Sequence, residues 1–527
     1  MNFLGLDYST QKLKAIVVDI EGNIIYEKNI DFDSELGHYY TSHGIHNFEN
    51  GIVCSPPLMW IEATDMMFNH LSLHCDLSKV VALSGSAQQH TTMFWVSNIN
   101  TILASLDPNK SLLDQLKNCF SKPLSPSWMD SSTQEECSIL ENSFGGKLDF
   151  QCRIGSTLAK RFSGPQIMKA FKNDNNLNDL TGFITLVSNG ICSIFAGKVV
   201  GIDTADAAGT GLAKSGSKFW DEEICSIISR NLISKLGVIT SSKHIVGFLN
   251  DYFVKRYKMN PSCQVVSFTG DNPSSVVGML LNENDICISL GTSDTMFACV
   301  SQCPKKFIDI PTFVFPHPLK SEVLVTLLCY KNGSQTRENV SNQISNGDWD
   351  IFNKILNINP PGNNGVFGLY FDLEEIIPPG IKGRFFIDVN SNDDIILNTS
   401  DLDSASIIRS LIEGQLFTKF YHFSKIFPAC KESTGKLLIT GGGSINEEIL
   451  QIASDIFEKP VFTIDTVNSA ALGAVYRAIA ATHENVFHSH FPSKCQHLKH
   501  RCNPISGEIY KNLLPKFSEF LEGVSKN

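Results

Sequence analysis

The sequence has no long apolar run: no stretch approaches the roughly 20 residues that a helix needs to cross a bilayer. Its first eight residues include an acid and no basic segment, and lysines follow where a signal peptide would have an apolar core. Positive charge is also scarce, with 43 lysines and arginines against 54 acids and a net charge of -11. We therefore expect a cytoplasmic protein that binds neither a membrane nor nucleic acid.

The sequence also lacks the cysteine spacing of a disulfide framework. Its 15 cysteines are an odd number and form no Cys-x-x-Cys pair, which favours reduced thiols. One cluster has the residue types of a metal site, namely Cys495, His497, His500 and Cys502. Because its spacing fits no familiar zinc module, we assign it no metal.

Two common nucleotide-binding signatures are missing. No Gly-Lys pair is followed by Ser or Thr, which excludes a Walker A loop, and no Gly-x-Gly-x-x-Gly follows a strand, which excludes a simple Rossmann site. With 527 residues the chain is too long for one core, and about two to four domains are expected. Residues 186–213, rich in small side chains, give no motif.

The stretch 265–277 is the most informative one. Apolar residues suited to a strand run into Thr269-Gly270-Asp271-Asn272-Pro273, and the spacing after Pro273 suits a helix. Such residues are also ordinary helix-start chemistry, with Asp or Asn as the cap and Pro in the first turn. Only the other motifs of the chain favour a functional carboxylate at Asp271.

Two predicted hairpins have the same design. Residues 3–26 are expected to form three antiparallel strands, with Asp7 closing the first and Ser9 and Thr10 in the turn. Residues 285–300 repeat the pattern with a Gly-Thr292-Ser293 turn. Exposed amides and hydroxyls of both turns suit a phosphate, and Asp7 suits Mg²⁺ bound through water, although it is equally a residue that starts a turn.

A polar loop follows the predicted strand 80–83. Its Gln88-Gln89-His90 offers donors and acceptors without net charge, which suits a polyhydroxylated ligand, although a structural histidine is an equal alternative for His90. Arg161 lies at the approach to a predicted helix, where a surface arginine is the ordinary interpretation.

A second glycine-rich turn lies between the strand 436–440 and the helix 447–457. Gly441 and Gly442 have no side chain, so a flat ring or a ribose could approach the backbone there. Such turns are common, and the signal is weak by itself. The indole of Trp349 is expected either in the core or against a purine.

In their order along the chain, these pieces resemble the FGGY carbohydrate kinases, and within that family the eukaryotic D-xylulose kinases. The resemblance spans nearly the whole chain. The motifs that carry it are Gly5–Thr10 with Val18-Asp19, Gln88–His90, Trp128–Thr133, Arg161-Phe162, Thr269–Pro273, Ser289–Thr295, Lys331–Ser334, Thr440–Gly442 with Asn446, and Asp465 with Asn468–Ala470. Glycerol kinases have Gln-Arg-Glu in place of Gln89-His90-Thr91, which argues against glycerol.

The resemblance implies an α/β protein of two actin-like lobes of the ribonuclease-H type, with the active site in the cleft between them. It implies that Asp271 is the general base, and that His90, Arg161, Asp271 and Asn272 bind the sugar. The nucleotide residues that it implies, together with the hydroxyls of the two turns, are Ser9, Thr10, Thr292, Ser293, Trp349, Gly441, Gly442 and Asn446. ATP and D-xylulose are the implied substrates, with Mg²⁺ near Asp7.

The expected division is a sugar-binding lobe over residues 1–284 and a nucleotide-binding lobe over 285–527, in a monomer or a homodimer. Two alternatives remain at this point. One is a kinase of the same family that acts on another ketose or a polyol, such as ribulose. The other is an actin-like or chaperone-like ATPase, or a catalytically silent sugar sensor, which the presence of both Asp7 and Asp271 together with the polar loop Gln88–His90 disfavours.

Overall fold

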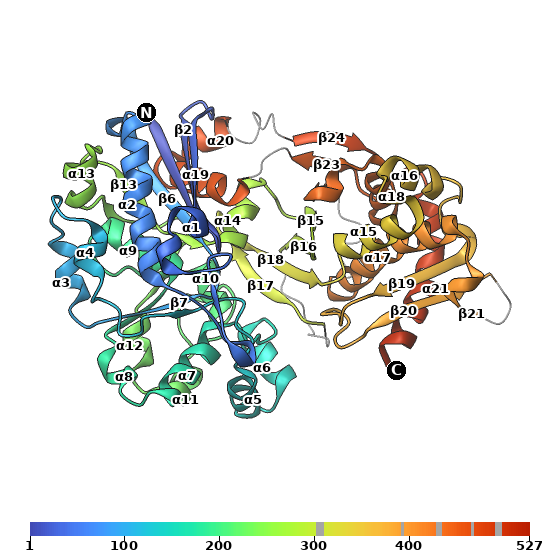
Figure 1. Ribbon diagram of the computed structural model, residues 1–527, viewed down its shortest axis with the longest axis horizontal. Helices are drawn as coiled ribbons and strands as arrows, with labels where there is room; N and C mark the ends of the chain where they lie inside the picture. The colour runs from blue at the N-terminus through green and yellow to red at the C-terminus, as the bar shows by residue number, and fades with distance from the viewer. Residues whose placement is uncertain (302–309, 391–394, 428–434, 465–467, 491–497, 527) are drawn as a thin grey trace. The chain divides into compact units, whose positions relative to one another are not determined.

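The computed structural model describes the chain except for residues 302–309, 391–394, 428–434, 465–467, 491–497 and 527 (Figure 1). The described residues form two compact units. The first contains Met1–Leu280, Val314–Leu324 and the described part of 466–495, and the second contains the other described residues. The chain therefore returns to the first unit twice after Leu280.

A mixed sheet forms the centre of the first unit, in the order β12-β13-β6-β1-β2-β3, with β14 paired to β6. Its strands are β1 (Asn2–Tyr8), β2 (Lys12–Asp19), β3 (Ile24–Asp31), β6 (Val80–Ala87), β12 (Ile245–Phe248), β13 (Gln264–Val266) and β14 (Thr269–Gly270). The three antiparallel strands predicted near the N-terminus are confirmed. Because β6 runs parallel to β1, β13 and β14, the carboxyl ends of these strands lie at one edge of the sheet.

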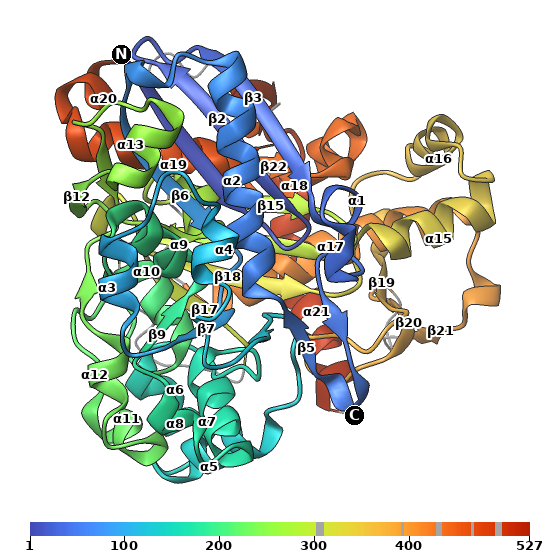
Figure 2. The ribbon, with the colours of Figure 1, turned by 60° about the vertical axis from the view of Figure 1, so that its left-hand side comes forward.

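Helices cover both faces of this sheet, which explains the nearly continuous apolar runs of β1 and β2. Leu4 and Leu6 face a core that includes residues of α2 (Pro57–His74) and α9 (Val187–Ala196). Phe3 faces a second core, built with α19 (Ser469–Thr482). Figure 2 shows α2 lying over β2 and β3. Other helices of this unit are α5 (Gln134–Asn142), α7 (Ser163–Asn173), α10 (Thr204–Ala207) and α13 (Asp251–Tyr257).

The helix α14 (Asp271–Gly278) lies in direct backbone contact with α19. A Cβ atom on Gly473 would lie 1.8 Å from the carbonyl oxygen of Ser274, so only glycine permits this approach. The Ser274 hydroxyl also donates a hydrogen bond to the Ala470 carbonyl at 2.7 Å. The small residues of α19 thus fix the helix that begins with Asp271.

The second unit has its own mixed sheet, in the order β17-β18-β16-β15-β22-β23-β24. Its strands are β15 (Ile286–Leu290), β16 (Asp294–Val300), β17 (Phe313–His317), β18 (Lys320–Tyr330), β22 (Leu437–Thr440), β23 (Val461–Ile464) and β24 (Leu498–Cys502). The predicted second hairpin is confirmed as β15 and β16, which pair antiparallel. As β1 pairs with β6, so β15 pairs in parallel with β22, which repeats the arrangement of the first unit.

A smaller sheet, β19-β20-β21, and several helices complete the second unit. These elements are β19 (Val366–Phe371), β20 (Gly383–Asp388), β21 (Ile395–Leu397), α15 (Ser334–Ser345), α16 (Trp349–Leu356), α17 (Ser404–Ile426), α18 (Glu447–Phe457) and α21 (Gly507–Lys526). The predicted α/β class with a mixed sheet in each half is confirmed. The assignment of sugar binding to residues 1–284 and of nucleotide binding to residues 285–527 stays a prediction.

None of the described helices combines the length and the apolar character of a membrane-spanning segment.

Candidate functional site

Asp271 is the first residue of α14 and directly follows β14. This confirms the strand-to-helix junction that the sequence predicts. Since β14 pairs with the end of β6, Asp271 lies at the sheet edge where β1 and β6 also end. Its Oδ1 accepts a hydrogen bond from the backbone amide of Asn272 at 2.8 Å, so one oxygen is oriented by the helix start.

Burial and, second, the negative charge of Asp7 raise the pKa of Asp271 from 3.8 to about 7. The amide of Asn272 and the positive charge of Lys14 act in the opposite direction with less effect. A carboxyl group with a pKa near neutral pH can take up a proton and release it again in each cycle. Asp271 therefore has the electrostatic setting of a general base.

Asp7 lies near the end of β1 and is 1% exposed. Its Oδ2 accepts a hydrogen bond from Ser9 Oγ at 2.5 Å, and its Oδ1 accepts one from Ser86 Oγ at 2.9 Å. Lys14 Nζ lies 3.5 Å from Oδ2. Because both oxygens already have protein partners, Asp7 fits a cation held through water better than one coordinated directly.

The loop after β6 holds His90 in an unusual conformation, buried and with a φ of 66°. Its Nδ1 lies 2.8 Å from the carbonyl oxygen of Gly209, so Nδ1 carries the proton and donates it. Burial and the charge of Arg161 lower the pKa of His90 to about 3. The ring is therefore neutral, and it stacks on Phe162 with 4.9 Å between centroids. In this tautomer Nε2 is a hydrogen-bond acceptor.

Arg161 is partly buried just before α7, and its charge acts on His90. Among the described residues, no hydrogen bond or ion pair engages its guanidinium group. Asn272 Nδ2 donates to Gln89 Oε1 at 3.0 Å, which joins the β6 loop to the start of α14. The sheet edge of the first unit and the loops beside it therefore contain Asp7, His90, Arg161, Asp271 and Asn272, whose roles in binding and catalysis stay predictions.

Two buried acids near this edge were missed from the sequence. Asp206 is 1% exposed, and Ser188 Oγ donates to its Oδ2 at 2.5 Å. Burial and then the charge of Asp203 raise the pKa of Asp206 well above its usual range. A Cβ atom on Gly270 would lie 2.8 Å from Asp206 Oδ1, so this acid lies behind the β14–α14 junction. In the sequence, Asp203 and Asp206 lie three residues apart and are followed by small residues, and this pattern is the signal that could have identified them.

The two predicted phosphate turns differ in how their hydroxyls are engaged. In the first unit, Ser9 donates to Asp7, and Thr10 Oγ1 accepts a hydrogen bond from Trp128 Nε1 at 2.8 Å. In the second unit, Thr292 and Ser293 are exposed between β15 and β16. The Thr292 and Ser293 hydroxyls are thus presented at the surface of their unit.

The glycine turn after β22 lies beside the end of β15. Gly441 has a φ of 81°, and a Cβ atom there would lie 2.6 Å from the carbonyl oxygen of Leu290. A Cβ atom on Gly442 would meet nothing within 4 Å. Gly441 is therefore required by the close approach of two strands, whereas Gly442 faces open space that a ligand can fill.

Trp349 is the first residue of α16 and is 37% exposed, so the expectation of a core indole is wrong. Its ring centroid lies 4.9 Å from that of Phe352. Asn446 caps α18 by accepting from the amides of Glu448 and Ile449, and its Nδ2 donates to Asn353 Oδ1 at 2.9 Å. Since Asn353 belongs to α16, this hydrogen bond connects the helix of Trp349 to the glycine turn.

The predicted residues thus fall into two sets, one in each unit. Within the described ranges, no group of three or more His, Cys, Asp or Glu side chains is arranged to hold a metal ion. Cys495 and His497 of the cysteine-histidine cluster lie outside the described residues, as does Asp465. Of that cluster, His500 and Cys502 belong to β24, and His500 Nε2 lies 3.1 Å from Asn503 Oδ1.

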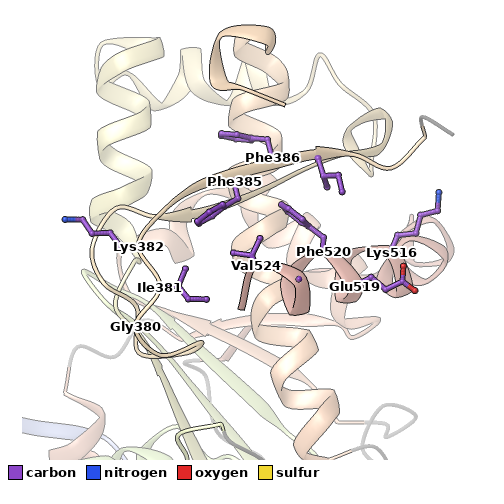
Figure 3. Close-up of a pocket in the computed structure, with 11 residues that line it drawn as sticks. Gly380, Ile381, Lys382, Phe385, Phe386, Lys516, Glu519, Phe520 and Val524 are labelled. Carbon is purple, nitrogen blue, oxygen red and sulfur yellow. The ribbon is translucent and has the colours of Figure 1, made fainter. Parts of the chain in front are cut away.

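A pocket of about 610 Å³ lies in the second unit, between β20 with its preceding loop and α21 (Figure 3). Phe385 and Phe520 face its interior, whereas Lys382 points away from it. The residues that line it are Gly380, Ile381, Lys382, Phe385, Phe386, Ile387, Lys516, Glu519, Phe520, Gly523 and Val524. None of them is a predicted site residue, and we place no chemistry there.

Comparison with known proteins gives a match over almost the whole chain. Residues 2–278 match the FGGY family of carbohydrate kinases, N-terminal domain, and residues 286–482 match the C-terminal domain of the same family. A xylulose kinase of Mus musculus is 38% identical over 525 residues, which cover 98% of this chain and 93% of the relative.

Solved structures share the fold at low sequence identity. A xylulose kinase from Rhodospirillum rubrum superposes with a TM-score of 0.81 at 13% identity, covering 99% of each chain. A gluconate kinase from Lactobacillus acidophilus gives a TM-score of 0.77 at 18% identity, covering 99% of this chain and 98% of the other. The predicted two-lobed, actin-like fold is confirmed by these matches. Kinases named for different sugars share the fold, which therefore does not fix the substrate.

Proposed function

Because this chain belongs to the FGGY family of carbohydrate kinases, we propose that it transfers the γ-phosphoryl group of ATP to the C5 hydroxyl of D-xylulose. The products are D-xylulose 5-phosphate and ADP. The substrate is proposed from the relative named xylulose kinase, which is 38% identical over nearly the full length. The absence of the Gln-Arg-Glu of glycerol kinases at Gln89-His90-Thr91 supports a sugar over glycerol.

The observation that supports the chemistry best is the setting of Asp271. It lies at the start of a helix, beside a second acid and among sheet ends, with a pKa near 7. Asp271 accepts the proton of the C5 hydroxyl while that oxygen attacks the γ-phosphorus in line, and no phospho-enzyme forms. Near neutral pH much of this carboxyl is ionised, and the proton it gains is released to solvent after the product leaves.

Three further residues of the first unit bind the sugar in this proposal. His90 Nε2 accepts a hydrogen bond from a sugar hydroxyl, because Nδ1 is committed to Gly209. Arg161 donates to sugar oxygens with a guanidinium that no described residue engages. The Asn272 side chain also binds sugar oxygens, and its hydrogen bond to Gln89 fixes its position.

The nucleotide is assigned to residues of the second unit, and the turn at Ser9 and Thr10 of the first unit is kept as a predicted phosphate-binding turn. Trp349 packs against the adenine, the backbone at Gly441 and Gly442 lies against the ribose and phosphates, and Asn446 fixes the turn. Thr292 and Ser293 donate to phosphate oxygens. Asp7 would hold Mg²⁺ through water, and the cation would neutralise charge on the phosphates.

The substrate proposal predicts the result of a sugar panel. Purified protein with ATP and Mg²⁺ is expected to release ADP fastest with D-xylulose, more slowly with ribulose and other ketoses or polyols, and hardly at all without sugar. A coupled assay of ADP release measures this.

A rate with D-xylulose no higher than with buffer contradicts the substrate. A higher rate with ribulose assigns the protein to another ketose, and sugar-independent ATP hydrolysis favours the actin-like ATPase. ATP binding without transfer to any sugar favours a sensor.

Replacement of the half-exposed indole tests the nucleotide site. Trp349→Ala is expected to raise the KM for ATP about tenfold, the usual worth of stacking one base on an aromatic ring. The KM for the sugar is expected to stay within about twofold, because Trp349 belongs to the nucleotide set. Trp349→Phe, which keeps an aromatic ring, is the matched control. Its KM for ATP should lie between those of the wild type and Trp349→Ala. Equal KM values for ATP in all three proteins would remove Trp349 from the site.

A further inference from the structure

A buried ion cluster lies directly beneath the turn that carries Thr292 and Ser293. Asp294, the next residue, is 0% exposed and begins β16. Arg337 of α15 binds both of its oxygens, with Nη1 to Oδ2 and Nη2 to Oδ1 each 2.9 Å. Lys419 of α17 also lies 2.9 Å from Oδ2. One carboxylate is thus held by two buried cations from two different helices.

The same cluster is joined to the loop Lys331–Ser334. Gln415 of α17 accepts a hydrogen bond from Arg337 at 2.7 Å and donates one to the Asn332 carbonyl at 2.9 Å. Glu375 accepts from the amide of Lys331 at 2.6 Å and from that of Asn332 at 3.1 Å. The loop is therefore held from two sides by buried side chains.

The loop Lys331–Ser334 also contacts the predicted phosphate turn, Gly291–Ser293. The Ser334 amide donates to the Gly291 carbonyl at 2.7 Å. A Cβ atom on Gly333 would lie 2.6 Å from that carbonyl and 2.7 Å from Asp294 Oδ1. Position 333 therefore has no room for a side chain between the turn and the carboxylate. The carboxylate of Asp294 and the carbonyl of Gly291 thus contact the same short segment, Gly333 and Ser334.

The charge and the geometry of this ion cluster indicate a role in orienting the turn, beyond a contribution to stability. Removing one partner of a buried ion pair leaves an uncompensated charge, and such pairs are often no more stabilising than apolar residues. A bidentate contact fixes direction as well as distance, because the planar guanidinium accepts only one orientation of the carboxylate. The buried carboxylate directly follows the two residues, Thr292 and Ser293, whose side chains are exposed.

We propose that Asp294, gripped by Arg337 and Lys419, is a positioning residue that fixes the Gly291–Ser293 turn against the Lys331–Ser334 loop and so places the transferring phosphate of ATP. This inference rests on the proposed function, since it assigns a phosphate to Thr292 and Ser293. Asp294 itself does not touch the substrate. Its effect is expected in ATP binding and transfer, and not in sugar binding.

The test uses two variants of the full chain. Asp294→Asn keeps the shape and removes the charge, and Arg337→Lys keeps the charge and removes the bidentate contact. For Asp294→Asn we expect about a hundredfold loss of kcat/KM for ATP, because a shift of about 1 Å in positioning groups costs that much. Arg337→Lys is expected to show a smaller loss of kcat/KM for ATP. Both should keep the KM for the sugar within about twofold.

A matched control exists on the same helix. Glu413 of α17 is 1% exposed, pairs with Arg409 Nε at 2.7 Å and accepts from Tyr510 at 2.6 Å. Within the described residues its hydrogen bonds go to Gly362, Arg409 and Tyr510, and none reaches the phosphate turn. Glu413→Gln is expected to lower the urea midpoint as Asp294→Asn does, while the KM for ATP stays unchanged.

Binding of ATP with Mg²⁺ in the absence of sugar, measured by calorimetry, separates the possible results. Wild-type protein that binds no ATP contradicts the proposed function, and the inference with it. Wild-type protein that binds ATP, with Asp294→Asn and Arg337→Lys binding and reacting equally well, overturns the inference alone. Weakened ATP binding in all three variants, Glu413→Gln included, assigns the cluster a purely structural role and also overturns it. If Asp294→Asn does not fold, the ATP binding of Arg337→Lys is compared with that of the wild type and Glu413→Gln instead.

Discussion

Asp271→Asn is expected to lower kcat by about a hundredfold or more while the protein still binds sugar and ATP. The asparagine amide has the same shape as the carboxyl group but cannot accept the proton of the attacking hydroxyl, and a positioned base contributes about 10²–10⁴-fold. Steady-state kinetics with D-xylulose measures kcat, and calorimetry with each substrate measures binding. The loss should appear in kcat with little change in KM for either substrate.

The pH dependence gives this prediction a second readout. Since the pKa of Asp271 is raised to about 7, the ionised and active form is lost as the pH falls below that value. The kcat/KM of the wild type is therefore expected to rise between about pH 6 and pH 8, with its midpoint near 7. The residual activity of Asp271→Asn should lack this rise.

Stability separates a lost base from a lost fold. Because the folded protein binds the Asp271 proton more tightly than the unfolded chain does, this group contributes stability below its ordinary pKa of 3.8, and the contribution is lost as the pH rises to about 7. Asp271→Asn lacks the buried charge and should be at least as stable as the wild type at pH 8 in urea unfolding. Near-normal kcat in this variant would remove Asp271 from the role of base.

Asp7→Asn is expected to have the second largest effect, a loss of about a hundredfold in kcat at pH 8. In the proposed function its carboxylate would hold Mg²⁺ through water near the phosphates, and removing one preorganised electrostatic group typically costs about 10²–10³-fold. A titration of Mg²⁺ at fixed ATP should show that more Mg²⁺ is needed for half-maximal rate. The measurement is initial ADP release against free Mg²⁺.

The same substitution should also shift the pH profile. The charge of Asp7 raises the pKa of Asp271, and that of Lys14 lowers it. Without the Asp7 charge, the midpoint of the acidic limb is expected to move below 7. Lys14→Met is the matched control with the opposite expected shift. It removes the positive charge that lowers the pKa of Asp271, so the midpoint should move above 7. A profile that stays fixed in both variants would contradict the coupling of these residues to Asp271.

Much of the local structure could be predicted from the sequence, because short-range rules decide it. The hairpin turns at Ser9-Thr10 and Thr292-Ser293 follow from apolar runs interrupted by small polar residues. The junction at Asp271 follows from glycine and proline around an acid. The order of the motifs then allowed the family to be recognised, although no single motif was specific.

Long-range packing decided the rest, and the sequence could not show it. For Trp349 the sequence left a core position and a position against a purine open, and only its place at the start of α16, 37% exposed, excludes the core. Asp206 belonged to a stretch without a motif, and only the fold places it behind Gly270. The contact of Asp294 with Arg337 and Lys419 joins residues 43 and more positions apart.

By itself, the amino-acid sequence determined which elements form and in what order, since strand periodicity, turn residues and helix starts act over a few neighbouring residues. Only the tertiary structure decided the chemical state of the key groups. Asp271 acquires a pKa near 7 because burial and Asp7 disfavour its charge, and His90 stays neutral because burial and Arg161 disfavour its proton. These are effects of distance and solvent exclusion, which arise when strands far apart in the sequence, such as β1 and β14, belong to one sheet.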